Sequence, residues 1–180
     1  MKNTEQKYGW LSILFHWLSV VIVIGMFILG IWMVDLEYYD AWYKSAPALH
    51  KSIGISFLLL MLLRVVWRKM QPQPEPLSTH SEMERKMGHI MHLALYGLIF
   101  LIMVSGYLIA TADGRGINVF DLFTIPGFDE FMEDQEDVAG EIHEILAYTL
   151  ILMVIAHAGA AIKHHVIDKD STLKRMLGRS

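Results

Sequence analysis

The chain has 180 residues, of which 54% are hydrophobic and only 19% are charged. A soluble domain carries about 25% charged residues, so this chain has too few to cover a water-facing surface. The composition excludes disordered, collagen-like and basic nucleic-acid-binding proteins, and no nucleic acid partner is expected. The sequence has no cysteine, which excludes disulfides, iron–sulfur clusters and covalently attached c-type haem, and leaves nine histidines as possible ligands.

Long runs without Asp, Glu, Lys or Arg mark the predicted helices. They cover residues 8–34, 88–112 and 145–162, and a fourth apolar run over 49–67 has charges only near its ends. A bilayer core needs roughly 20 helical residues, so we expect membrane-spanning helices at about 10–34, 49–68, 88–111 and 142–165. A soluble four-helix bundle would need a polar face on each helix. The prediction is an all-α, integral membrane four-helix bundle formed by a single domain, 1–180.

The basic residues predict the orientation of this bundle. With four spans, both termini and the 69–87 loop share one side of the membrane, and only Lys44, Lys51 and Arg115 fall on the other side. The positive-inside rule then places both termini in the cytoplasm, with lipid around the four helices. The 12 basic residues on the predicted inner side are Lys2, Lys7, Arg64, Arg68, Lys69, Arg85, Lys86, Lys163, Lys169, Lys174, Arg175 and Arg179.

Histidines inside membrane helices are costly and therefore suggest function. His143 and His157 are 14 residues apart in the last predicted helix. That spacing places both rings on one face of the helix, about 21 Å apart along its axis. Two haems placed one above the other in a membrane bundle require this vertical separation.

Each haem then needs a second axial ligand at the matching depth. His50 is level with His143 near the outer side, and His16 is level with His157 in the inner half. We therefore expect the pairs His50–His143 and His16–His157 to bind two b-type haems, with the four imidazoles as iron ligands suited to electron transfer. His92 is the rival to His16, but it lies about one turn nearer the cytoplasmic surface.

Several further residues are candidates for cofactor contacts. Arg64 is 14 residues after His50, so it shares that face at the inner end and is placed to pair with a haem propionate. Gly54 is one turn after His50, and Gly30 and Gly106 follow His16 and His92 by 14 residues; glycine allows a flat macrocycle to approach the backbone. The alternative is that such small residues only permit helix–helix contact. Lys51, beside His50, is placed either to attract an anionic substrate or to bind a propionate.

The remaining histidines are less informative. His89 and His92 share one face of the third predicted helix, where they are placed to contact a propionate or a quinone, although ordinary interfacial polarity explains them equally well. His164 and His165 are expected to be a solvated helix end, and His80 lies in a loop. No catalytic residue is assigned from the sequence.

A family resemblance becomes specific at these residues. The order and spacing of the matching stretches are similar to those of the bacterial cytochrome b561 family over essentially the whole chain. The stretches are Phe15-His16-Trp17-Leu18, Leu49-His50-Lys51-Ser52-Ile53-Gly54, Arg64, Trp67-Arg68, Gly88-His89 through His92, Ser105-Gly106-Tyr107, Glu141-Ile142-His143-Glu144, His157, and the tail from His164-His165 to Met176.

The resemblance implies a dihaem oxidoreductase that passes electrons to ubiquinone. One class of relatives is the superoxide oxidases, which take electrons from periplasmic superoxide; more distant relatives are haem-b subunits that serve a partner dehydrogenase or hydrogenase. Two hypotheses about the donor therefore stay open, superoxide and a periplasmic redox protein, beside a non-redox transporter or structural protein. An acidic outer loop over 113–141 repels superoxide unless it lies away from the haem edge, and suits a basic partner. Its acidic residues include Asp129, Glu130, Glu133, Asp134, Glu136, Asp137 and Glu141.

Overall fold

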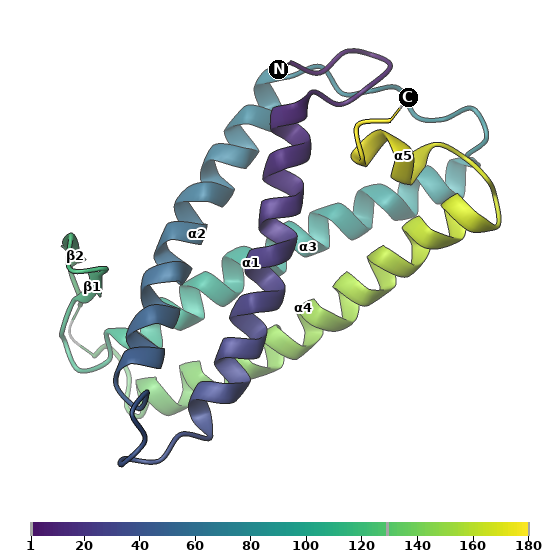
Figure 1. Ribbon diagram of the computed structural model, residues 1–180. Helices are drawn as coiled ribbons and strands as arrows, with labels where there is room; N and C mark the ends of the chain where they lie inside the picture. The colour runs from purple at the N-terminus through teal and green to yellow at the C-terminus, as the bar shows by residue number, and fades with distance from the viewer. Residues whose placement is uncertain (1, 129, 180) are drawn as a thin grey trace. The chain divides into compact units, whose positions relative to one another are not determined.

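The computed structural model describes residues 2–128 and 130–179, so Asp129 of the acidic loop lies outside the described residues. Four long helices follow one another along the chain (Figure 1): α1 (Trp10–Val34), α2 (Ser45–Met70), α3 (Glu82–Ala110) and α4 (Gln135–Val166). An antiparallel hairpin of β1 (Ile117–Val119) and β2 (Phe123–Ile125) lies between α3 and α4, and the short helix α5 (Thr172–Met176) follows α4. The predicted all-α class is confirmed.

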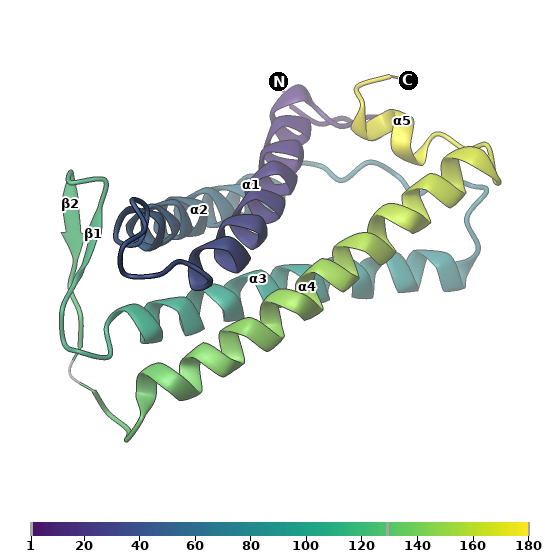
Figure 2. The ribbon, with the colours of Figure 1, turned by 60° about the horizontal axis from the view of Figure 1, so that its bottom comes forward.

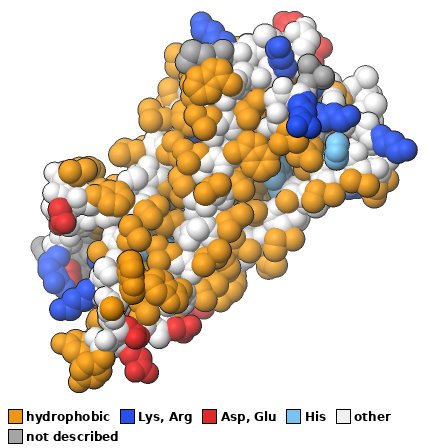
Figure 3. All heavy atoms as spheres, viewed as in Figure 1, with side chains coloured by type: hydrophobic (Ala, Val, Ile, Leu, Met, Phe, Trp, Pro, Cys, Tyr) orange, Lys and Arg blue, Asp and Glu red, His pale blue; other side chains and the backbone are white. Residues whose placement is uncertain are grey.

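The surfaces of the long helices are apolar. Within the described residues, four helices are long and apolar enough to cross a membrane. Val21 and Leu152 are each 67% exposed, and hydrophobic side chains dominate the visible face of the helices in Figure 3. Exposed apolar surface on this scale is unfavourable in water but costs nothing against lipid chains. The four predicted membrane helices are therefore confirmed as elements of the fold.

Three of the four long helices begin earlier in the sequence than predicted. α1 has the predicted bounds, but α3 begins at Glu82 instead of near residue 88. Ser81 and Glu84 form a capping box, in which the Ser81 amide donates to Glu84 Oε2 (2.9 Å) and the Glu84 amide donates to Ser81 Oγ (3.2 Å). α4 begins at Gln135 instead of near residue 142, with acidic residues in its first turn that favour a helix N-terminus. α2 also begins earlier than predicted, at Ser45.

Contacts divide the chain into two compact units, and each unit contains segments of all four long helices. Unit 1 comprises residues 2–20, 60–97 and 152–179, and unit 2 comprises residues 21–59 and 98–151.

Unit 1 contains the N-terminal segment and the segment around α5, which both lie at the upper side of Figure 2. The Asn3 amide donates to Gln71 Oε1 (3.2 Å), and the Glu75 amide donates to the carbonyl of Glu5 (2.8 Å). The Arg175 guanidinium in turn donates to the carbonyl of Glu75 (2.7 Å). The proline-rich segment after α2 thus joins the N-terminal segment to the segment around α5.

Unit 2 contains the hairpin, which is tied to α2 through one serine. Ser52 Oγ donates to the carbonyl of Asn118 (3.3 Å) and accepts from the amide of Phe120 (3.2 Å). Ile117 and Val119 on β1 are 3% and 1% exposed, so the strand has a buried face. The hairpin is therefore fixed beside the first turns of α2, two residues from His50.

Candidate functional site

Unit 2 brings His50 of α2 and His143 of α4 together. Their ring centroids are 6.3 Å apart, and the ring planes are inclined by 68°. Imidazole nitrogens bind transition metals at about 2.0 Å, and the ring centroid lies about 1.2 Å behind the nitrogen, so two imidazoles on opposite sides of one metal have centroids about 6.4 Å apart. The separation of these two rings equals the distance that a six-coordinate iron between them requires.

The hydrogen bonds of His143 determine which of its nitrogens is free. Its Nδ1 lies 3.1 Å from the carbonyl oxygen of Ile102 and 3.0 Å from Ser105 Oγ. A carbonyl only accepts, so Nδ1 carries the proton, and Nε2 keeps its lone pair for a metal. Ser105 Oγ itself donates to the Ile102 carbonyl (2.9 Å), so the hydroxyl is left to accept from His143. Such outer hydrogen bonds orient metal-binding histidines.

Two glycines lie directly against these rings. A Cβ on Gly106 would be 3.1 Å from Cε1 of His143, and a Cβ on Gly30 would be 3.4 Å from Cε1 of His50. The Nδ1 atom of His50 is buried and has no hydrogen-bond partner among the described residues. Both rings therefore pack on bare backbone, where a side chain would displace them.

Unit 1 brings together His16 of α1 and His157 of α4. Their ring centroids are 6.4 Å apart with an interplanar angle of 64°, which again equals the spacing across one metal. The ring of His92 on α3 lies 5.2 Å from that of His157. That distance is too short for a metal between two opposed imidazoles, so the geometry favours His16 over His92 as the partner of His157.

Arg64 lies beside the His16 ring in unit 1. Its Nη2 is 3.1 Å from His16 Nδ1, and its Nη1 donates to Ser19 Oγ (2.8 Å). The guanidinium also lies over the ring of Tyr96, 5.5 Å from the ring centroid. Because a guanidinium only donates, His16 Nδ1 accepts in this arrangement and the proton lies on Nε2. His16 and His143 therefore have opposite tautomers.

Within the described residues, the other predicted site residues have no hydrogen bond, ion pair or ring contact with the paired histidines. Gly54 faces the methyl group of Met26, which would lie 3.7 Å from an added Cβ, an ordinary contact. His89 and Lys51 have exposed side chains, and among the described residues neither forms a side-chain hydrogen bond or an ion pair. The structure thus assembles His50, His143, His16, His157 and Arg64 into two clusters and leaves these three residues at their edges.

Outside the helices, Arg115 is paired with Asp113. The Nε atom of Arg115 donates to Asp113 Oδ2 (2.6 Å), and this hydrogen bond, followed by one from the Arg115 amide, lowers the pKa of Asp113. Lys51 is close enough to contribute to the same shift. Two of the three basic residues predicted on the outer side therefore have an acidic residue nearby.

Sequence reasoning missed several residues that complete these clusters. Ser105, Ser19 and Tyr96 each contact a predicted site residue or its partner. Helical spacing was an available signal, since Ser19 follows His16 by three residues and Tyr96 follows His92 by four. The structure also departs from the expected solvated helix end, because the side chain of His164 is only 16% exposed and lies beside Asp170.

These observations define a class of protein: a membrane protein in which histidine rings from different apolar helices lie in close pairs. A protein-family model described as prokaryotic cytochrome b561 matches residues 7–179. The chain belongs to this family, which implies a haem-b-containing membrane cytochrome of electron transport.

Individual relatives agree with this assignment. Cytochrome b561 homolog 2 of Escherichia coli (strain K12) is 52% identical over 178 residues, covering 99% of this chain and 95% of the relative. The "Probable superoxide oxidase CybB" of Yersinia pestis is 29% identical over 178 residues, covering 96% and 97%. Cytochrome b562 of Cereibacter sphaeroides is 28% identical over 179 residues, covering 96% of each chain.

Proposed function

We propose that this chain is a transmembrane dihaem cytochrome that carries electrons from a periplasmic donor to the membrane quinone pool. His50 and His143 hold one haem b, and His16 and His157 hold the other. The whole chain acts as a single domain in the bacterial inner membrane with both termini in the cytoplasm. The observation that carries the proposal is the spacing of the two pairs, whose ring centroids lie 6.3 and 6.4 Å apart.

The chain's residues have separate tasks in this scheme. Haem b, when bound, would supply one-electron transfer, and the imidazoles of each pair would hold its iron. Ser105 and the Ile102 carbonyl keep His143 in the tautomer that ligates through Nε2. Arg64 supplies a positive charge for a propionate, and ligation through His16 Nε2 requires Arg64 to release Nδ1.

Superoxide is the donor that we favour. Two superoxide anions each lose one electron and leave as O₂, while one quinone takes up two electrons and two protons to become quinol. Lys51, beside His50 and exposed, supplies the positive charge that attracts the anion. The 29% identical relative whose name includes superoxide oxidase supports this choice.

The first test is the haem content of the purified chain. We expect two haems per chain, both extractable with acidified acetone because there is no cysteine to form thioether bonds. A fully loaded preparation with one haem per chain contradicts the paired-ligand scheme, and a chain without a haem absorption band contradicts the function itself. Superoxide-dependent quinol formation is then compared between the unmodified chain, Lys51→Glu and the matched control Lys44→Glu. Slower superoxide-dependent quinol formation in Lys51→Glu, but not in Lys44→Glu, supports superoxide as the electron donor.

An electron-relay subunit is the second candidate, and one observation favours it. Lys51 and Arg115 both lie near Asp113, and the chain from Glu130 to Glu141 is strongly acidic, so this region suits a basic redox protein better than an anion. Salt-sensitive reduction of the purified cytochrome by a small basic redox protein, together with absence of superoxide turnover, would favour the relay.

For the quinone, we propose a site in unit 1 near His89, His92 and Arg64. The two histidines offer hydrogen bonds or protons to the quinone oxygens, and Arg64 stabilises negative charge. The test is haem reoxidation by a soluble ubiquinone analogue in His89→Ala, His92→Ala and Arg64→Ala proteins that retain both haems. Slower reoxidation in at least one supports the site, and unchanged rates in all three remove it.

A further inference from the structure

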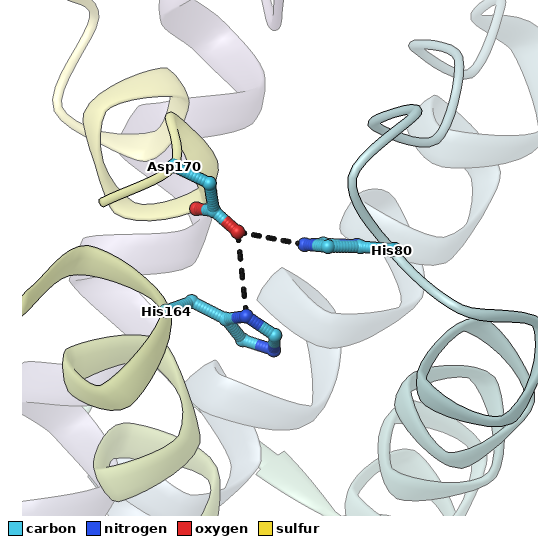
Figure 4. A group of neighbouring side chains, drawn as sticks. All are labelled: His80, His164 and Asp170. Carbon is cyan, nitrogen blue, oxygen red and sulfur yellow. Dashed lines mark hydrogen bonds and ion pairs between the residues drawn. The ribbon is translucent and has the colours of Figure 1, made fainter. Parts of the chain in front are cut away.

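A second cluster of ligand-type side chains lies in unit 1 (Figure 4). It consists of His80 from the segment before α3, His164 from the last turn of α4, and Asp170 from the segment between α4 and α5. The side chains of His80, His164 and Asp170 are only 17%, 16% and 3% exposed. Three separate parts of the chain thus deliver two imidazoles and one carboxylate to one buried point.

The distances between the donor atoms are those of a small coordination shell. Asp170 Oδ2 lies 2.9 Å from His80 Nε2 and 3.3 Å from His164 Nδ1, and the three donor atoms all lie within 4.8 Å of one another. Ligands at about 2.0 Å from a tetrahedral metal are about 3.3 Å apart. At the two Asp170 contacts, movements of at most a few tenths of an ångström would therefore give the spacing of ligands around one ion.

Hydrogen bonding leaves one of these donor atoms unused. His164 Nδ1 is buried and makes no hydrogen bond within the described part of the chain, although carboxylate oxygens of Asp168 and Asp170 lie 2.8 and 3.3 Å away. Buried polar atoms are rarely left without a partner. On the opposite side, the amide of Thr172 donates to Asp170 Oδ1 (2.8 Å) and holds the carboxylate toward the two rings.

The carboxylates around the cluster differ in whether a lysine neutralises them. Lys163 Nζ contacts Asp168 at 2.7 Å and Glu84 at 3.3 Å, so these two carboxylates share a cation. Among the described residues, Asp170 has ion-pair contacts only with the two imidazoles. A buried carboxylate is costly unless a positive charge or a metal balances it.

We propose that His80, His164 and Asp170 bind one divalent transition-metal ion, with Zn²⁺ the best match to two imidazoles and one carboxylate. Binding displaces the proton shared by His80 and Asp170, and Asp168 or a water completes the coordination. The ion joins the segments before α3 and after α4 to the end of α4, so its role is structural. This site is independent of the haems and of the proposed electron transfer.

The test uses the full-length, haem-loaded chain without a histidine tag. After equilibration with Zn²⁺ and removal of unbound metal, elemental analysis should give one zinc per chain, and competition with a chromophoric chelator gives its affinity. His80→Gln and Asp170→Asn should each weaken Zn²⁺ binding by more than about 100-fold, since even residues that only support a ligand contribute 10–100-fold. A chelator should lower the melting temperature of the unmodified chain and leave that of Asp170→Asn unchanged.

Two variants serve as matched controls. His165→Ala removes a neighbouring histidine, and Glu84→Gln removes a neighbouring carboxylate while keeping the capping hydrogen bond. Both should bind zinc as the unmodified chain does, and the haem spectrum verifies that every variant is folded. Absence of zinc from the unmodified chain, or equal affinity in His80→Gln, Asp170→Asn and the controls, overturns the proposal and leaves the cluster as a hydrogen-bonded contact.

Discussion

The Nη2 atom of Arg64 lies 3.1 Å from Nδ1 of His16, whereas the corresponding nitrogen of His143 faces a carbonyl. One histidine therefore accepts from a cation and the other donates to an uncharged group. The two histidine pairs have nearly the same ring separation, but their electrostatic surroundings are different. This asymmetry distinguishes the redox properties of the two proposed haems.

Replacing Arg64 should lower the midpoint potential of the haem in unit 1. A positive charge disfavours the oxidised, more positive haem, and at roughly 8 Å with an effective dielectric constant of about 20 its removal is worth about 2 kcal/mol, or on the order of 90 mV for one electron. Potentiometric titration of Arg64→Leu should shift one haem by this amount and leave the other in place. Arg68→Leu is the control, since Arg68 also lies over Tyr96 but, among the described residues, forms no hydrogen bond with His16. Equal shifts in both variants would contradict a specific role for Arg64.

Single histidine substitutions should separate the two haems. His50→Ala and His143→Ala should each remove the same haem, and His16→Ala and His157→Ala should each remove the other, because an iron left with one imidazole is bound far more weakly. The measurement is haem per chain together with the reduced-minus-oxidised spectrum of each variant. His92→Ala should keep two haems, since its ring is only 5.2 Å from that of His157. Loss of a haem in His92→Ala with retention in His16→Ala would reverse the assignment of the unit 1 pair.

The apolar runs predict the helices well but underestimate their length. The length of a charge-free run follows from the thickness of the membrane. The helix itself extends beyond that run to the residues that cap its ends. For that reason α3 begins six residues before the predicted position, at a Ser81–Glu84 capping box that the sequence already contains. The hairpin between α3 and α4 was not predicted, since its strands are only three residues each and have no alternating pattern long enough to detect.

Ligand spacing along a single helix is also predictable, because helical geometry converts sequence separation into position. Depth along the helices predicts that His143 lies near His50 and His157 near His16, and their ring centroids are 6.3 and 6.4 Å apart. That these pairs bind haem stays a prediction. By contrast, His80 and Asp170 are 90 residues apart, and no periodicity connects two loops. Their contact depends on how the chain turns back after α4, where the Asp170 amide donates to the carbonyl of His164 (3.0 Å).

Ser52→Ala should loosen the hairpin without unfolding the helices. The substitution removes both hydrogen bonds between Ser52 and β1 and its turn, and a buried hydrogen bond contributes about 1 kcal/mol. Hydrogen exchange at the Phe120 amide should become roughly tenfold faster or more, while exchange in the long helices stays unchanged. Ser56→Ala is a suitable control, because Ser56 Oγ donates only to the Ser52 carbonyl within α2. Unchanged protection at Phe120 would show that the apolar face of β1 alone holds the hairpin.

A reporter fused to the C-terminus should be active only in the cytoplasm. The expectation rests on the distribution of Lys and Arg, 12 of 15 of which fall on the side predicted to be inner. Paired fusions of a reporter that works in the cytoplasm and one that works in the periplasm provide the measurement. A fusion within the 35–44 segment, on the opposite side in this topology, should give the opposite pattern. Periplasmic activity at the C-terminus would invert the proposed orientation and with it the assignment of donor and quinone sides.

Gly106→Ala should weaken haem binding in unit 2. Gly30→Ala and Gly25→Ala provide two variants for comparison. The added methyl would lie 3.1 Å from the His143 ring, which cannot easily move away because Ile102 and Ser105 hold its Nδ1 atom. Overpacking of this kind costs about 1–3 kcal/mol, which corresponds to roughly a tenfold to hundredfold loss of haem affinity if it acts on the ligated geometry.

The same methyl at Gly30 would lie 3.4 Å from the His50 ring, whose Nδ1 has no hydrogen-bond partner among the described residues, so the effect of Gly30→Ala should be smaller. Gly25→Ala, with nothing within 4 Å, should behave as the unmodified chain. Haem occupancy and the midpoint potential of the unit 2 haem are measured across the three variants. We expect the loss of haem to be largest for Gly106→Ala, smaller for Gly30→Ala and absent for Gly25→Ala. Along this series the added methyl lies farther from a histidine ring, and the His50 ring is freer to move away than the His143 ring. A Gly25→Ala defect as large as that of Gly106→Ala would instead assign the effect to lipid-facing helix packing and not to the ligand rings.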